Sequence, residues 1–192
     1  MVNAKEIYEQ FCKDWKMIGS DLPWDSGATP WTKKIFQYFS DEGKKRNFKV
    51  YADSGMIAGT QEYMVDLCWS NEDKDKYYGL ELAMESEWSE DEDEILYDFS
   101  KIVDIKSYLK IMIISVQEKK IRGIIDKMSS TVSEGKIKLP NEEYLIIIFT
   151  DDFEHAENER IGIIGFRMDN NGRYDKLPAY RFADGVLKGQ EA

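Results

Sequence analysis

Residues 78–88 have the sequence YGLELAMESEW, and this stretch decides the fold that we expect for the chain. Apolar and polar side chains alternate along it, which is typical of a β-strand. Successive side chains of a strand lie on opposite faces of the sheet. The sequence therefore predicts one face with Glu81, Ala83, Glu85 and Glu87 and an opposite face with Leu80, Leu82, Met84 and Trp88.

A second alternating run, residues 62–69, lies upstream and contains Asp66. As a strand, it would place Asp66 on one face with Met64 and Cys68, so that a single charge has apolar neighbours. An unpaired carboxylate is costly to bury. We therefore expect Asp66 to meet a cation, a hydrogen-bond donor or a metal ion.

The rest of the pattern predicts the order of helices and strands. Helices are expected over 4–18, about 30–43, 94–108 and 116–131, and strands over 48–52, 62–69, 78–88, 109–115, 144–150 and 161–168. The strands at 109–115 and 144–150 are almost wholly apolar, which indicates cover on both faces. This order predicts one α/β domain over residues 1–192, a mixed β-sheet flanked by helices, with the last twelve residues as a loose tail.

Composition narrows the class of protein. Hydrophobic residues make up 42% of the 192 residues, which indicates a packed core. No apolar run approaches the roughly 20 residues of a membrane helix, and the first residues lack a secretory signal. Cys12 and Cys68 form no disulfide framework or zinc motif. A cytoplasmic protein is expected.

The formal charge of −11 is unfavourable for binding duplex DNA, which requires a basic surface. Part of the acidity is the run at residues 89–94, which we expect to be a solvated loop. Basic residues cluster at 44–46 and 119–122, so a small basic surface is compatible with the sequence.

Three carboxylates are expected to meet at one edge of the sheet, namely those of Asp66, Glu85 and Glu87. Magnesium prefers oxygen ligands, with one or two carboxylates completed by water and phosphate. The pattern thus predicts a Mg²⁺ or Mn²⁺ site. The alternative is a half-exposed strand whose glutamates are simply solvated.

These residues resemble the PD-(D/E)XK, or restriction-endonuclease-like, nucleases. The core of that family runs helix, three-stranded meander, helix and strand, the order expected for about residues 30–115; residues 116–182 would be an extension. The resemblance implies that Asp66 is the motif aspartate and Glu85 the metal-binding glutamate. Glu87 would take the place of the usual lysine, and Lys101 on the following helix would supply the lysine, with Lys106 as second candidate.

The resemblance implies metal-dependent hydrolysis of a phosphodiester, with nucleic acid as the substrate and Asp66, Glu85 and Glu87 as metal ligands. Homodimers are frequent among such enzymes, although nothing in the sequence identifies an interface. Val65 stands where the motif has proline, and the lysine of the motif is absent. Two other interpretations remain open: a catalytically inactive member of the fold acting as a protein-interaction module, and an acidic immunity or mimic-type protein that binds a basic partner.

Two further polar features of the sequence lie outside this predicted site. The single histidine, His155, lies in a polar stretch and is expected at the surface, which is unfavourable for a His-dependent nuclease. The acidic stretch 151–154 follows an apolar strand and is expected to be a solvated strand end.

Overall fold

The computed structural model describes residues 2–18, 27–74, 76–150, 159–183 and 186–189 of the chain. Its four helices are α1 (Ala4–Ile18), α2 (Ala28–Lys45), α3 (Glu92–Asp104) and α4 (Glu118–Glu134). Its strands are β1 (Lys49–Ala52), β2 (Leu67–Asp73), β3 (Lys76–Glu87), β4 (Ser107–Ser115), β5 (Glu143–Thr150), β6 (Glu159–Asp169), β7 (Tyr174–Lys176), β8 (Tyr180–Ala183) and β9 (Val186–Gly189).

These strands form one mixed sheet, which confirms the predicted α/β class. Strands β1, β2 and β3 make an antiparallel meander, whereas β3, β4 and β5 are parallel to their neighbours. Helices α3 and α4 supply the two crossovers that parallel pairing requires. Beyond β5 the sheet returns to antiparallel pairing, with β6 beside both β7 and β8.

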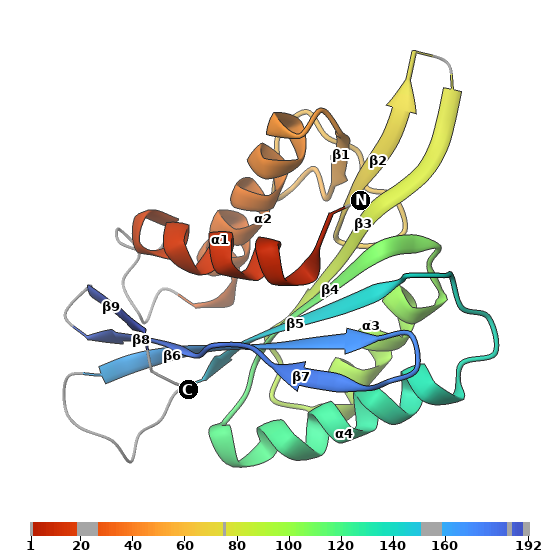
Figure 1. Ribbon diagram of the computed structural model, residues 1–192. Helices are drawn as coiled ribbons and strands as arrows, with labels where there is room; N and C mark the ends of the chain where they lie inside the picture. Colours follow the sequence, from red (N-terminus) through yellow and green to blue (C-terminus); the bar gives the residue numbers. More distant parts are fainter. Residues whose placement is uncertain (1, 19–26, 75, 151–158, 184–185, 190–192) are drawn as a thin grey trace.

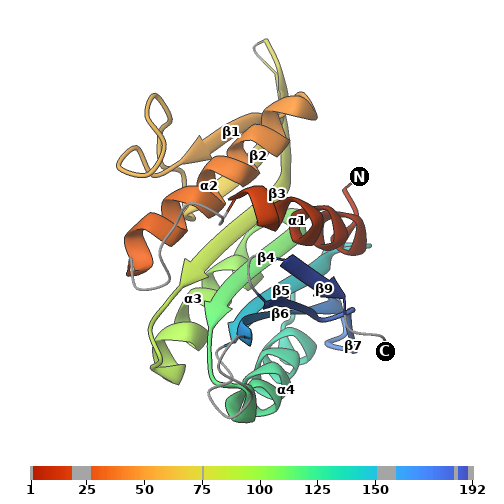
Figure 2. The same ribbon diagram turned by 90° about the vertical axis from the view of Figure 1, so that its left-hand side faces the viewer.

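The helices lie in two layers, one on each face of the sheet (Figures 1 and 2). Helices α1 and α2 cover one face, where Phe11, Phe39 and Trp69 belong to the first core. Helices α3 and α4 cover the other, where Phe99 and Ile124 belong to the second. The central strands β4 and β5 contribute to both cores, so the predicted cover on both of their faces is confirmed.

The acidic run at residues 89–94 is more than a solvated loop. Asp91 is the N-cap of α3, and its Oδ1 accepts a hydrogen bond from the Asp93 amide at 2.8 Å. Residues 92–94 form the acidic first turn, where carboxylates interact favourably with the helix dipole. The local charge pattern therefore fixes where the helix next to β3 begins.

Several predicted boundaries are wrong. The strand expected over 62–69 begins at Leu67, so Asp66 precedes it. The helix expected over 94–108 ends at Asp104, which leaves Lys106 outside the helix. The tail expected to be loose contains the antiparallel pair β8 and β9. None of the described helices is long and apolar enough to cross a membrane.

A β-bulge changes the predicted faces of β3. Trp69 pairs with Leu82, whereas the next residue, Ser70, pairs with Leu80, so Glu81 is an extra residue in β3. Glu81 is thereby placed toward α1, where its Oε1 accepts a hydrogen bond from the Val2 amide at 2.6 Å. The expectation that Glu81 shares a face with Glu85 is therefore wrong.

Candidate functional site

The candidate site lies where β2 begins and β3 approaches its end. Pairing of the two strands extends to Leu67 opposite Met84. Just beyond this pair, the Asp66 carboxylate accepts a hydrogen bond from the Ser86 amide at 2.9 Å. The side chain thus takes a backbone donor that strand pairing would otherwise use, which fixes Asp66 beside Glu85.

The Glu85 side chain is almost fully buried, with 1% of its surface exposed. Its neighbour Ala83 belongs to the core beneath α3, and Glu85 lies on the same face two residues later. Within the described residues, Glu85 Oε1 has no hydrogen-bond partner. A buried oxygen of this kind is costly unless a ligand satisfies it.

Lys101 on α3 supplies the positive charge. Its Nζ lies 2.9 Å from Glu85 Oε2 and 2.9 Å from Asp98 Oδ1, one turn earlier on the same helix. The N-cap at Asp91 sets the start of α3, and the apolar positions Phe99 and Ile102 bury its inner face. Lys101 is therefore directed toward the carboxyl end of β3.

Asp66, Glu85, Asp98 and Lys101 together form what we call the Glu85 cluster. Burial and then the nearby Asp66 raise the pKa of Glu85 to about 8, although Lys101 opposes the shift. Burial also raises the pKa of Asp66, against the Ser86 amide and Lys101. Burial lowers the pKa of Lys101, but its hydrogen bonds to Glu85 and Asp98 outweigh this effect and the net shift is upward.

The structure thus brings together three of the four residues predicted from the sequence: Asp66, Glu85 and Lys101. Glu87 is placed differently. Its Oε1 accepts a hydrogen bond from the Ser89 amide at 2.6 Å, within a local turn that follows the strand. No hydrogen bond or ion pair of the described residues joins Glu87 to the Glu85 cluster.

Sequence reasoning missed Asp98. A signal was present, because Asp98 lies three residues before Lys101 and such pairs are neighbours on a helix. The two charges were not connected to the site, however, until the packing of α3 against β3 was known. Lys106, the second lysine candidate, follows the end of α3 and has no contact with the described carboxylates of this cluster.

The carboxylates of the Glu85 cluster meet some of the requirements of a hard cation such as Mg²⁺. Asp66 and Glu85 are neighbouring carboxylates, and the partnerless Glu85 Oε1 is an available ligand atom. Within the described residues, no group of three or more His, Cys, Asp or Glu side chains is arranged to hold a metal ion. A metal here would depend on two carboxylates, with water and substrate phosphate as the remaining ligands.

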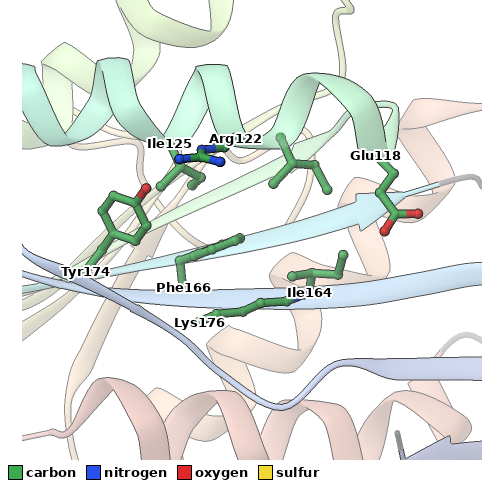
Figure 3. Close-up of a pocket in the computed structure, with 8 residues that line it drawn as sticks. Glu118, Arg122, Ile125, Ile164, Phe166, Tyr174 and Lys176 are labelled. Carbon is green, nitrogen blue, oxygen red and sulfur yellow. The ribbon is translucent and has the colours of Figure 1, made fainter. Parts of the chain in front are cut away.

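A groove of about 340 Å³ lies elsewhere, between α4 and strands β6 and β7 (Figure 3). Ile125 and Phe166 are among the apolar residues that line it, and both are already buried in the core. Glu118 lies toward one end of the groove, whereas Arg122 and Tyr174 lie toward the other. The Tyr174 hydroxyl is bound to Asp126. The groove therefore lacks the converging polar groups found at the Glu85 cluster.

His155 and the acidic stretch 151–154 lie outside the described residues. No protein-family model matches the sequence, and no curated protein matches it. The candidate site thus rests on the geometry of the Glu85 cluster.

Proposed function

We propose that this chain is a metal-dependent nuclease of the PD-(D/E)XK type, which hydrolyses a phosphodiester bond of nucleic acid. One observation carries the proposal: Glu85 is a buried carboxylate with a partnerless oxygen and a pKa of about 8, and it faces Asp66 and Lys101. Strongly shifted groups of this kind gather at functional sites. On a strand face with no function, Glu85 would instead be expected to point into solvent.

The element order supports the proposal. Helix α2, the meander β1 to β3, helix α3 and the parallel strand β4 follow in the order that the resemblance implies. The aspartate stands at the start of the second strand and the glutamate near the end of the third. Fold alone does not establish function, so the argument depends on the residues that this order brings together.

The residues of the chain have distinct roles in this proposal. Asp66 and Glu85 would bind Mg²⁺ or Mn²⁺ through their carboxylate oxygens. The metal would supply a hydroxide near neutral pH and neutralise charge on the scissile phosphate. Lys101 would stabilise the negative charge of the transition state by placing its ammonium beside the phosphate. Glu87 would serve as third ligand or general base, which would require its carboxylate to leave the Ser89 amide.

The biological setting is part of the proposal. The enzyme would act in the cytoplasm on DNA or RNA, in restriction, defence or repair. It could form a homodimer, as similar enzymes frequently do. The net charge of −11 predicts weak, salt-sensitive contact with the phosphate backbone outside the site.

A second candidate is a catalytically inactive fold that acts as a protein-interaction module. The contact that favours it is the ion pair between Lys101 and Glu85, because an ammonium already neutralises the carboxylate that would bind metal. The net acidity further agrees with a basic protein partner.

The test combines metal binding with cleavage. Calorimetric titration of Mg²⁺ and Mn²⁺ should show binding to the wild type that is lost in Asp66→Asn and Glu85→Gln. The same variants should fail to cleave single-stranded and duplex substrates, while Glu118→Gln, a change at an exposed carboxylate of α4, should match the wild type. Full cleavage by Glu85→Gln would refute the site, and absence of any metal-dependent cleavage would favour the interaction module.

A further inference from the structure

Three tyrosines lie on the face of the sheet that also carries the Glu85 cluster. Tyr51 of β1 is aligned with Cys68 of β2, which in turn is aligned with Ala83 of β3. Cys68 and Ala83 belong to the core on the α3 side, and Tyr51 packs against that core. The ring centroids of Tyr51 and Tyr63 are 5.7 Å apart, and burial and then the nearby Tyr63 raise the pKa of Tyr77. We call Tyr51, Tyr63 and Tyr77 the tyrosine cluster.

The Tyr51 ring is held in place by polar contacts, whereas the Tyr63 and Tyr77 rings are accessible. The exposed fractions are 45% for Tyr63 and 59% for Tyr77. The Tyr51 hydroxyl donates a hydrogen bond to Glu72 at 3.0 Å, and the ammonium of Lys49 lies 4.8 Å from the centre of the Tyr51 ring. Large aromatic side chains usually bury their area, so the exposed Tyr63 and Tyr77 beside the fixed Tyr51 are a candidate binding surface.

The tyrosine cluster begins beside the candidate site and extends away from it along β2, because Tyr77 is aligned with Glu72, six residues from Asp66. Tyr51 is aligned with Cys68, which is two residues from Asp66. Because a strand rises by about 3.3 Å per residue, Tyr51 lies close to Asp66 along the strand direction. Helix α3 packs against β3 and β4, so its layer ends beside β2 and leaves the tyrosines uncovered by that helix. On the helix itself, Tyr97 is 68% exposed, and Lys101 Nζ lies 6.0 Å from the centre of its ring. Aromatic rings therefore flank the Glu85 cluster on both sides.

We infer that this surface binds an unpaired nucleic-acid strand, whose bases stack on the tyrosine cluster while a phosphate reaches Asp66 and Glu85. The inference rests on the proposed nuclease function and adds the class of substrate. An exposed ring can stack only on a base that has left its own stack, so the surface selects a single strand over a duplex. The net charge of −11 opposes backbone contacts with either form of nucleic acid, so stacking would have to supply most of the affinity.

The experiment measures binding apart from cleavage. Fluorescence anisotropy in the presence of EDTA would follow labelled oligothymidylate and oligouridylate of about 12 nucleotides, a length within the usual single-strand site size, and a duplex of the same length. We expect the single strands to bind more tightly than the duplex. Comparison of the two single strands shows whether DNA or RNA is preferred, through the sugar and the thymine methyl group together.

Tyrosine variants then locate the surface. Tyr63→Ser and Tyr77→Ser should each weaken single-strand binding about tenfold, as expected for loss of one stacked base, whereas Tyr63→Phe should retain most of the affinity. Tyr108→Ser is the matched control, because Tyr108 is 41% exposed and lies on β4, which β3 separates from β2. Thermal melts would confirm that these surface variants fold.

The outcomes separate this inference from the proposed function. Tyrosine-dependent binding without any cleavage in Mg²⁺ or Mn²⁺ would support the surface and refute the nuclease. Metal-dependent cleavage that Tyr63→Ser and Tyr77→Ser leave unchanged would support the nuclease and overturn the surface. Tighter binding to the duplex, or no binding to any of the oligonucleotides, would also overturn it.

Discussion

Lys101 Nζ lies 2.9 Å from Glu85 Oε2 and so places a positive charge directly against the most buried carboxylate of the site. The same ammonium is 2.9 Å from Asp98 Oδ1. A divalent cation bound to Glu85 would repel it. A metal ion at this site would therefore compete with Lys101 for Glu85, and Asp98 would offer the lysine a second partner.

Replacement of this lysine should have opposite effects on metal binding and on cleavage. Lys101→Met removes the competing charge, and we expect the affinity for Mg²⁺ to rise about tenfold, or by about 1.4 kcal/mol. Cleavage should become slower because the ammonium no longer stabilises the transition state. Calorimetry and single-turnover kinetics would measure the two effects. Lys106→Met, which removes an equal charge beyond the end of α3, should change neither, and unaltered metal affinity in Lys101→Met would exclude the competition.

Glu85 should also make the stability of the protein depend on pH. Its pKa is 4.5 in an exposed setting and about 8 in the fold, so the folded state keeps a proton that the unfolded chain releases between these values. The stabilisation is fully present below pH 4.5 and is lost as the pH rises through about 8. Each unit of pKa difference corresponds to about 1.4 kcal/mol.

Urea denaturation of the wild type and Glu85→Gln across this pH range would measure the effect. The variant has no carboxyl group to titrate at this position, so its stability relative to the wild type should increase as the solution becomes alkaline. Asp66→Asn should behave in the same direction, since burial raises the pKa of Asp66 as well. Parallel pH profiles for wild type and Glu85→Gln would show that Glu85 ionises normally in the fold.

The sequence could predict the layers of the fold because they depend on local pattern. Alternation in 78–88 and the apolar runs at 109–115 and 144–150 follow directly from which faces are buried. The parallel pairing of β3 with β4 and of β4 with β5 then follows from the intervening helices. Asp66 and Glu85 could be paired in advance because they lie on strands that are neighbours in this order.

The remaining details depend on contacts between distant segments. Glu81 lies on the opposite face from the predicted one because β2 and β3 differ in length by a bulged residue, and alternation within β3 does not reveal a bulge. Glu87 was grouped with Glu85 by the same alternation, but its carboxylate is held by the Ser89 amide after the strand ends. Asp98 joined the site only through the packing of α3.

We expect a second charge pair, Lys110 with Glu142, to stabilise the fold without any role in the candidate site. Lys110 on β4 is almost fully buried, and its Nζ donates to the carbonyl of Val103, to the Tyr144 hydroxyl and to Glu142 at 3.3 Å. Glu142 also accepts from the Tyr144 hydroxyl at 2.5 Å. All three ammonium protons have acceptors, in contrast to the partnerless oxygen of Glu85.

Lys110→Met should therefore lower the free energy of unfolding by about 3–5 kcal/mol, because it leaves Glu142 buried without its counter-charge. The double variant Lys110→Met/Glu142→Gln should recover most of the loss, since no uncompensated charge remains. Urea denaturation of both single variants and the double variant would give the coupling energy. Additive losses in the double variant would mean that the pair is not coupled.

Two helix glycines should respond to alanine in opposite directions. Gly43 was expected to end α2, yet the helix continues to Lys45. Gly43 lies where α2 approaches the sheet closely. A Cβ at this position would lie 2.6 Å from Trp69 Nε1 and 2.8 Å from Val50 Cγ2. The Trp69 ring is fixed by its hydrogen bond to the Phe39 carbonyl at 2.9 Å, so the helix would have to move.

Gly43→Ala should therefore reduce the free energy of unfolding by about 1–3 kcal/mol, the usual cost of overpacking, despite the higher helix propensity of alanine. Gly123 in α4 is the matched control, because a Cβ there would meet nothing within 4 Å. Gly123→Ala should stabilise the protein by about 0.5–1 kcal/mol through reduced backbone entropy of the unfolded chain. Chemical denaturation would compare the two variants, and a stabilising Gly43→Ala would show that α2 does not pack against Trp69 as closely as the structure indicates.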